Sequence, residues 1–166
     1  MAILPGRYSA KIDGDFVVFL IGMRVNKPLQ VRKWFPVFTA MPRMINELKK
    51  DPDSGFLHAY NAIGTQGPFL VQYWRSFEHL ERFARDPGSA HLPAWKRFNQ
   101  AIGGAGEVGI WHETYRVRAG EYESIYGNMP RIGLGLVGEH APLGSTSTAA
   151  RRLDVRPEDQ APVAGY

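Results

Sequence analysis

Residues 68–98 read PFLVQYWRSFEHLERFARDPGSAHLPAWKRF, and this stretch decides the fold. Its first part, residues 69–75, is a run of aromatic and branched apolar residues that is typical of a strand. Ser76 can then cap a helix, apolar residues recur at helical spacing, and the Asp-Pro-Gly turn at 86–88 ends that helix. A second helical piece follows, with His91 at its entrance. The pattern predicts a strand that leads into a broken helix, and the break can form one wall of a pocket.

Apolar periodicity predicts further strands over residues 16–25, 56–65 and 108–117, and a short fifth strand over residues 122–126. A helix is expected between the first two strands, because apolar residues recur there with the spacing of a core-facing stripe. The resulting order, β-α-β-β-α-β, is the split arrangement of a ferredoxin-like α+β domain, with an antiparallel sheet and both helices on one face. The stripe consists of Trp34, Phe38, Met41, Ile45 and Leu48.

One domain is expected, because 166 residues are enough for a single core of ordinary size. Residues 16–138 hold all the predicted helices and strands. Residues 1–15 are expected to be a loose N-terminal arm. Residues 139–166 are expected to be a flexible tail, mostly disordered or loosely docked, because Gly, Pro, Ser, Thr and Arg dominate there.

Composition excludes several classes of protein. Cysteine is absent, which excludes disulfides, thiolate metal sites and a cysteine nucleophile. The net charge of +4 is modest and the basic residues are scattered among acidic ones, so no nucleic-acid partner is expected. No apolar run approaches the roughly 20 residues that span a bilayer, and no secretory signal is recognisable. We therefore expect a cytoplasmic protein without a membrane partner.

The predicted sheet is apolar on both sides. Along residues 16–25, both sets of alternating side chains are apolar. An antiparallel sheet with one face in water alternates apolar and polar residues instead. Because two helices on one side can cover only one face, the other face needs a separate cover. A second copy of the chain is the simplest cover, so we expect a homodimer in which two sheets pack face to face.

The fourth predicted strand brings ionisable side chains close to aromatic ones. His112 and Glu113 are adjacent, so their side chains point to opposite faces of the sheet. Glu113 shares its face with Trp111 and Tyr115. A carboxylate on a buried aromatic face either pairs with a cation or has a raised pKa and acts as a pocket acid or base. The candidate cations are Arg75 and Arg116.

The remaining histidines also have two interpretations each. His91 and Trp95 are four residues apart and lie on one helical face. His91 is either a helix-entry residue bonded to the backbone or a ligand or proton shuttle that faces a cavity. His79 is expected to be structural, because it lies in the first turn of an exposed helix. His58 is either a packed polar residue or a site residue.

Several runs of sequence carry a resemblance to a known family. The most specific are HLPAW at residues 91–95, WHETY at residues 111–115 and YGNMP at residues 126–130. Over roughly residues 15–138, the chain resembles a bacterial family that is named after a fungal polyketide-pathway (fumagillin) monooxygenase and grouped with the dimeric α/β-barrel superfamily. The resemblance implies a ferredoxin-like fold, a dimer and monooxygenase activity.

The resemblance also implies two alternatives for the cofactor. The wider superfamily contains cofactor-free quinone-forming monooxygenases, haem-degrading oxygenases and haem aldoxime dehydratases. In the haem-degrading group the iron ligand is a His that follows a Trp-containing third strand, late in the second helix. The residue with a similar position here is His91, which would be the axial ligand if haem binds. The expected cofactor is therefore haem or none.

These observations lead to one main hypothesis and two alternatives. The main hypothesis is an oxidoreductase of the monooxygenase type that acts on a small, largely apolar molecule held between the helices and the sheet. The alternatives are a haem-dependent lyase or dehydratase and a non-catalytic dimer that binds haem or a small molecule. The residues expected to take a proton from the substrate are His91, His112 and Glu113. The residues expected to contact the substrate are Tyr73, Arg75, Trp95, Trp111 and Tyr115, with Arg75 holding an anion.

Overall fold

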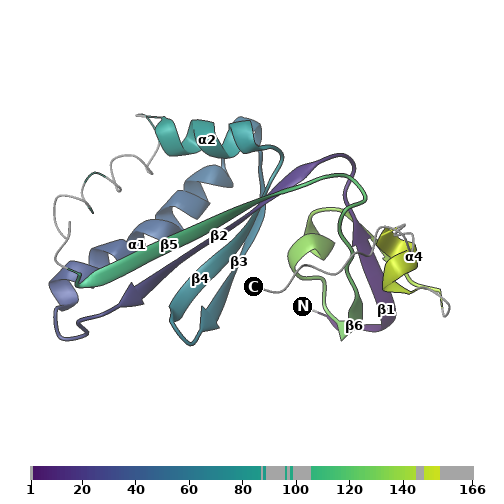
Figure 1. Ribbon diagram of the computed structural model, residues 1–166, viewed down its shortest axis with the longest axis horizontal. Coiled ribbons are helices and arrows are strands. Elements are labelled where there is room, and N and C mark those ends of the chain that lie inside the picture. The colour runs from purple at the N-terminus through teal and green to yellow at the C-terminus, as the bar shows by residue number, and fades with distance from the viewer. Residues whose placement is uncertain are drawn as a thin grey trace, which may run out of the picture. The chain divides into compact units, whose positions relative to one another are not determined.

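The chain folds into two compact units (Figure 1). The computed structural model describes residues 2–86, 88, 96, 98, 106–144 and 148–153. One unit is Phe16–Arg116, and the other combines Met1–Asp15 with Val117–Tyr166. The boundary expected after residue 15 coincides with a boundary between the units, whereas the boundary expected after residue 138 does not.

The larger unit has the predicted β-α-β-β-α-β order. Its four strands form one sheet in the order β3-β4-β2-β5, in which β4 is antiparallel to both β2 and β3. This is the ferredoxin-like α+β arrangement, and it confirms the predicted fold class. The elements are β2 (Phe16–Val25), α1 (Val31–Leu48), the 3-10 turn η1 (Pro52–Ser54), β3 (Phe56–Gly64), β4 (Gly67–Trp74), α2 (Phe77–Arg85) and β5 (Val108–Val117).

Local sequence explains where α2 begins and ends. Ser76 is its N-cap, and the Ser76 hydroxyl accepts a hydrogen bond from the backbone amide of His79 at 3.4 Å. Glu78 lies in the first turn, and Arg82 and Arg85 lie in the last. These charges complement the helix dipole, so α2 is stabilised at both ends.

α1 is longer but less regular than α2. Gln30, its N-cap residue, contributes no side-chain hydrogen bond to the described backbone, and Pro36 and Pro42 lie inside the helix. Each proline lacks the amide that would donate to the preceding turn, so the helix is weakened at two places. No helix in the described part of the chain combines the length and the apolar character that a bilayer crossing requires.

The predicted core-facing stripe of α1 is confirmed except at Phe38, because Trp34 and Met41 also pack against buried clusters. Ile45 and Leu48 are buried, whereas the Phe38 side chain is 47% exposed. The expectation that Phe38 faces the core is wrong. The predicted stripe is wider than the edge of α1 that rests on the sheet, so residues at its margin remain in solvent.

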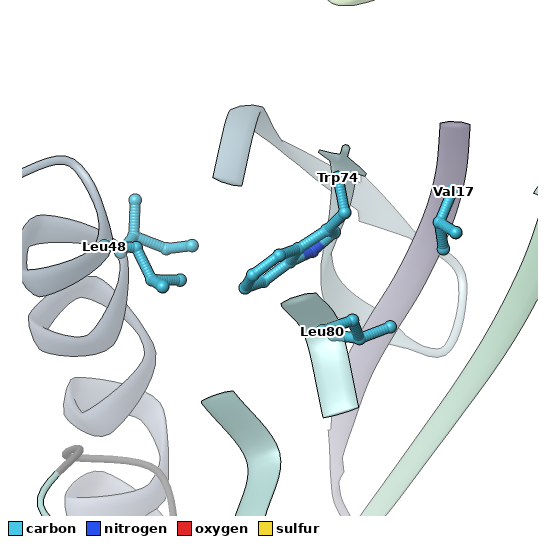
Figure 2. Packing of buried hydrophobic residues seen from close by; sticks show 5 residues of the cluster. Val17, Leu48, Trp74 and Leu80 are labelled. Carbon is cyan, nitrogen blue, oxygen red and sulfur yellow. The ribbon is translucent and has the colours of Figure 1, made fainter. Parts of the chain in front are cut away.

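The main core lies between the sheet and the two helices (Figure 2). Trp74 of β4 is fully buried, and its indole extends from the sheet toward Leu48 on α1, with Leu80 of α2 beside it. Val17 of β2 and Ile45 of α1 complete the buried cluster. Because burial of large apolar side chains is the main favourable term in folding, this cluster holds both helices on the same side of the sheet.

The register of the strands assigns side chains to two faces of this sheet. Val17 pairs with Trp74, and both belong to the buried cluster under α1 and α2, so they lie on the helix-covered face. Leu20 pairs with Val71 at positions of the opposite parity, which places them on the helix-free face. Both faces are therefore apolar, as the sequence predicts. The helix-free face also receives Val18, Phe69 and Tyr73.

The smaller unit corrects two expectations. β1 (Leu4–Lys11) is a strand rather than a loose arm, and it lies between β6 (Tyr126–Met129) and β7 (Glu139–Pro142), antiparallel to both. Residues 139–142 are thus part of a sheet rather than a flexible tail. The fifth strand expected over residues 122–126 is displaced to β6. The remaining described elements of this unit are η2 (Gly133–Leu136) and α4 (Ala149–Leu153).

β1 is hard to predict because its partners are distant and its pattern is interrupted. Pro5 and Gly6 break the apolar alternation, and the pairing with β6 shifts register between Leu4 and Arg7. The Gly6 amide donates a hydrogen bond to Asn128 Oδ1, which is 122 residues away, at 2.9 Å. Strand formation at this place depends on that distant pairing rather than on the local sequence.

Candidate functional site

A small apolar cavity lies between the two helices and the helix-covered face. Its volume is about 40 Å³. β2 and β4 form one side, and α1 and α2 form the other. Among the described residues that line it, Gln72 is the only polar one. The lining includes Phe19, Met41, Met44, Gln72, Leu80 and Phe83.

Gln72 is held in one orientation by its neighbour on β4. Its side chain is buried, at 3% exposure, and its Oε1 accepts a hydrogen bond from Trp74 Nε1–H at 3.0 Å. Because an indole N–H can only donate, the carbonyl end of Gln72 must face Trp74. The amide Nε2 is left beside Met41 Sδ at 3.9 Å. A thioether is a weak acceptor, so this N–H can donate to a polar atom that enters the cavity.

Sequence reasoning did not select Gln72, although a signal is present. In PFLVQYW, residues 68–74, it is the one polar residue of a strand that is otherwise apolar. A polar side chain in a buried strand needs a specific partner. Such a residue is therefore a site candidate before the fold is known.

His112 lies on the same side of the sheet as the cavity. Its imidazole contacts the ring of Phe19, with the ring centroids 5.5 Å apart, and Phe19 lines the cavity. His112 itself is exposed, because β5 is an edge strand. Of the predicted proton acceptors that the structure describes, His112 is the one that contacts a residue of the cavity lining, although it is not itself in the described lining.

Glu113 lies on the helix-free face, opposite His112, as their adjacency predicts. The Tyr115 hydroxyl donates a hydrogen bond to Glu113 Oε2 at 2.6 Å. This hydrogen bond, and the negative charge of Glu113, raise the pKa of Tyr115. Both side chains are exposed on the edge strand of the single chain, so the burial of Glu113 by a second copy stays a prediction. Among the described residues Glu113 forms no ion pair, and the expected pairing with Arg75 or Arg116 is not found.

Trp111 packs across β2 on the helix-free face. Its ring lies 5.9 Å from the ring of Phe69 between centroids. Gly22 makes this position accessible, because a Cβ at Gly22 would lie 2.6 Å from the Trp111 ring. Trp111 and Tyr115 are 37% and 50% exposed. They therefore form an aromatic surface that is available to another molecule.

Tyr73 and Arg75 lie away from the described lining of the cavity. Tyr73 is buried on the helix-free face, with its ring centroid 6.5 Å from that of Phe16. Arg75 follows β4, where its backbone amide donates to the Gly55 carbonyl at 2.8 Å and its side chain is exposed. These positions do not bring Tyr73 or Arg75 together with His112.

Two of the predicted site residues, His91 and Trp95, lie outside the described residues. Those that lie on strands divide between the two faces of the sheet: His112 contacts Phe19 on the side of the cavity, and Glu113 is on the opposite side. The predicted set is therefore not one constellation. Tyr73, Trp111 and Tyr115 accompany Glu113.

His79 and His58 have local surroundings that explain them. His79 Nδ1 lies 2.7 Å from the Ser76 hydroxyl, and its ring covers Gly55, where a Cβ would be 2.2 Å from it. This supports a structural role for His79. Burial and the positive charge of Lys49 lower the pKa of His58, which favours its neutral form.

A second hollow, of about 110 Å³, lies where the end of α1 meets η1 and α2. It is polar, with Asp51, His79 and Asp86 among its lining residues. Arg82 crosses part of it and donates from Nη2 to the Asp53 carbonyl at 2.7 Å. Over residues 2–86 and the other described segments, no group of three or more His, Cys, Asp or Glu side chains fits a metal ion.

Comparison with known proteins agrees with the resemblance seen in the sequence. Residues 16–134 match the family described as Monooxygenase af470-like. The chain is 34% identical over 155 residues to Monooxygenase af470 of Aspergillus fumigatus. That similarity covers 80% of this chain and 54% of the fungal protein, so the chain spans about half the length of this relative.

Solved structures with similar folds are more distant in sequence. SnoaB, a cofactor-independent oxygenase from Streptomyces nogalater, is 15% identical with a TM-score of 0.44, over 63% of this chain and 94% of SnoaB. A dimeric protein of unknown function with a ferredoxin-like fold from Bacteroides fragilis is 13% identical with a TM-score of 0.44, over 60% and 94% of the two chains. Because the family match covers most of the chain and the fungal relative is 34% identical, this chain belongs to the monooxygenase af470-like family.

Proposed function

We propose that this protein is an oxidoreductase of the monooxygenase type that oxidises a small, largely apolar molecule at the cavity under α1 and α2. The observation that carries the proposal is the family match, because residues 16–134 include the whole larger unit. The fungal relative is named a monooxygenase. The apolar lining with a single amide suits an apolar substrate that is oriented by one hydrogen bond.

The cavity must enlarge to hold an organic molecule. Pockets for drug-sized ligands have volumes of about 300–1,000 Å³, whereas this cavity has a volume of about 40 Å³. α1 is the wall best suited to move, because Pro36 and Pro42 interrupt its hydrogen bonds. Met41 and Met44 give that wall side chains that adapt their shape. We therefore expect the substrate to displace the part of α1 around Met41 and Met44.

A cofactor-free oxygenation requires a substrate that is a carbon acid. In the proposed reaction, His112 takes a proton from a CH₂ group next to a carbonyl, and the substrate becomes an enolate. Gln72 Nε2–H donates a hydrogen bond to the enolate oxygen in place of its weak contact with Met41. Apolar walls keep bulk water away from the anion.

Dioxygen then reacts with the enolate carbon. A C–O bond forms, and the proton held by His112 passes to the peroxide oxygen to give a hydroperoxide. Loss of water breaks the O–O bond and leaves a new carbonyl group. The sum is R₂CH₂ + O₂ → R₂C=O + H₂O, so the substrate supplies all four electrons.

The described residues do not form a cradle for haem. His91, the predicted axial ligand, lies outside them, and the described lining of the cavity contains no histidine that could hold the iron. The proposal therefore assigns each step to the polypeptide and the substrate. An absorbance spectrum of protein purified from a haem-replete host is expected to show no Soret band. A band that disappears in His91→Ala would replace this proposal with a haem-dependent one.

We also propose that the functional form is a homodimer joined through the helix-free faces. That face carries Leu20, Val71 and the partly exposed Trp111 and Tyr115. A sheet face in water would alternate with polar residues, and this one does not. Covering it with a second copy leaves both cavities on the outer sides of the paired sheets.

Oxygen uptake tests the proposed reaction. Anthrone is a suitable probe, because it is an apolar carbon acid whose CH₂ group is conjugated with its carbonyl through the aromatic rings, so that loss of a proton gives an enolate-type anion. We expect uptake above the spontaneous rate, and a fall in kcat of at least about 100-fold in His112→Ala. Gln72→Ala is expected to lower kcat by about 100-fold through loss of one donor to the developing oxyanion.

Glu113→Gln is the matched control, because Glu113 is the neighbour of His112 on the same strand but faces the other side. Glu113→Gln is expected to consume oxygen at the same rate as native protein. A native rate no faster than the spontaneous one, across anthrone and a panel of phenols, contradicts the proposed function. Equal rates for His112→Ala and native protein contradict the assignment of the base.

A further inference from the structure

α1 carries an apolar stripe that does not face the core. Val31, Phe35 and Phe38 are 50%, 52% and 47% exposed, and their spacing of four and three residues puts them on one side of the helix. Leu29, just before the helix, is 97% exposed. The rings of Phe35 and Phe38 both pack edge-on against Trp34, at 6.1 and 6.5 Å between centroids. We call Leu29, Val31, Phe35 and Phe38 the outer stripe.

The surface around the outer stripe is basic. Arg32 and Arg43 are both exposed on α1, and their separation of eleven residues, about three turns, puts them on the same side of the helix next to the stripe. Residues 16–46 contain no Asp or Glu. The other basic residues of that stretch are Arg24, Lys27 and Lys33.

The outer stripe is not explained by the fold or by the proposed dimer. The buried residues of α1 are Met44, Ile45 and Leu48; Met44 and Leu48 lie to one side of the stripe, and Ile45 lies two turns after Phe38, beyond the last residue of the stripe. The dimer uses the helix-free face of the sheet, whereas α1 lies on the helix-covered face. The stripe therefore stays exposed in both states. Clustered exposed aromatic residues on a soluble domain mark an interaction surface.

We infer that the outer stripe docks this protein onto the surface of a bilayer rich in anionic phospholipid. Its apolar side chains enter the boundary between head groups and acyl chains, while Arg32 and Arg43 contact the phosphates. Charge selects this occupant over a second copy of the chain, because an α1–α1 contact brings like charges together. Surface docking needs no spanning segment, so the lack of one in the sequence does not oppose it.

Docking would also place α1 against the bilayer, where apolar molecules concentrate. α1 is the wall that we expect the substrate to displace, so a docked protein would receive its substrate from the lipid side. This consequence rests on the proposed function. The docking itself does not, and it is tested without measuring activity.

Vesicle co-sedimentation of the full chain tests the inference. The probes are vesicles of phosphatidylcholine alone and of phosphatidylcholine mixed in equal parts with phosphatidylglycerol. We expect binding to the mixed vesicles, weaker binding to the neutral ones, and a loss of binding as salt is raised. Phe35→Ser/Phe38→Ser is expected to weaken binding to mixed vesicles by at least about tenfold. Arg32→Glu/Arg43→Glu is expected to weaken it by at least about tenfold as well.

Two matched variants show whether the effect is local. Ile63→Ser removes another exposed apolar residue, 89% exposed on β3, and is expected to leave binding unchanged. Lys49→Glu/Lys50→Glu makes the same change in net charge at the other end of α1, and is expected to bind several-fold more tightly than Arg32→Glu/Arg43→Glu. Should the double Phe variant lose its helical circular dichroism, Leu29→Ser tests the same stripe from outside the helix, with several-fold weaker binding expected.

Three results would overturn the inference. The first is no binding of native protein to the anionic vesicles. The second is an equal loss of binding in the two charge-reversal pairs, which would mean attraction by net charge without a docking surface. The third is a drop in oligomer mass in solution on Phe35→Ser/Phe38→Ser, which would make the stripe an interface between copies of the chain.

Discussion

At the residue scale, His140 has surroundings that suit only its neutral form. Its imidazole stacks on Tyr8, with ring centroids 4.8 Å apart and planes 8° apart, and lies 5.3 Å from the ring of Tyr126. Both ring nitrogens are buried, and neither has a hydrogen-bond partner among the described residues. An imidazolium would carry two unsatisfied donors there. Burial, and the positive charge of Arg131, accordingly lower the pKa of His140.

This environment predicts a loss of stability in mild acid. Because the folded pKa lies below the ordinary value of 6.5, the unfolded chain takes up a proton first as the pH falls below 6.5. The free energy of unfolding therefore decreases as the pH is lowered below 6.5, and it stops decreasing below the folded pKa. His140→Phe keeps the stacking on Tyr8 and removes the titration. We expect the urea midpoint of the variant to fall less than that of native protein between about pH 7 and about pH 5.

His140→Phe should retain part of the acid sensitivity, because burial and the positive charge of Lys49 lower the pKa of His58 as well. His58→Phe is the matched comparison, and the two substitutions together should remove more of the pH dependence than either alone. Identical urea midpoints for His140→Phe and native protein at both pH values would contradict this explanation.

Gly22 shows how a single missing Cβ permits an aromatic contact. An alanine there would place its Cβ 2.6 Å from the Trp111 ring and 2.8 Å from Phe69 Cβ, and the second atom is tied to the backbone of β4. Gly22→Ala is therefore expected to lower the free energy of unfolding by about 1–3 kcal/mol, the usual cost of overpacking. Gly109→Ala is the control, since its nearest contacts would be 3.8 Å away. Equal urea stabilities for the two variants would show that Trp111 moves aside at no cost.

At the element scale, the two prolines of α1 link stability to substrate entry. Pro42→Ala restores a backbone donor in the helix interior, so it is expected to stabilise the protein by about 1 kcal/mol or more. If the part of α1 around Met41 and Met44 must be displaced, the same change should lower kcat/KM for the organic substrate several-fold. Thermal unfolding and oxygen-uptake kinetics measure the two effects. A more stable variant with unchanged kcat/KM would show that α1 stays in place.

Elements with strong local signals were predictable from the sequence. β2 and β5 have the predicted bounds, and α2 begins after its predicted cap at Ser76. In each case, the pattern of apolar residues and the flanking turn residues indicate the same structure. β1 and β7 were not predictable, because each is short or interrupted and is stabilised by a partner that is distant in the chain. The prediction for Phe38 was wrong because the spacing of apolar residues indicates which side of α1 faces the sheet but not how wide the contact between α1 and the sheet is.

The candidate site was predictable in its parts but not in its assembly. Alternation along β5 correctly separated His112 from Glu113. The sequence alone did not show that Met41 of α1 would meet Gln72 of β4 at the cavity, because that contact arises from the packing of two elements. It also suggested burial for Glu113, which the single chain leaves exposed on an edge strand and which only a second copy would provide.

At the scale of the whole molecule, the helix-free face predicts a dimer that a single charge can break. Trp111→Glu would bury an unpaired carboxylate in the proposed interface, which costs several kcal/mol. We expect light scattering to give twice the chain mass for native protein and the chain mass for this variant. Phe77→Glu, at an equally exposed aromatic residue on α2, is the control and should remain dimeric. A native protein that is monomeric at micromolar concentration would contradict the proposed dimer.

The most direct test of oxygen insertion at the cavity is isotope incorporation. Native protein and Gln72→Ala are each supplied with anthrone under dioxygen that carries the heavy oxygen isotope, and the product is weighed by mass spectrometry. We predict one heavy oxygen atom in the new carbonyl group of the product, formed above the spontaneous rate by native protein and about 100-fold more slowly by the variant. A product whose new oxygen comes from water, or one formed equally fast by both proteins, would contradict monooxygenation at this site.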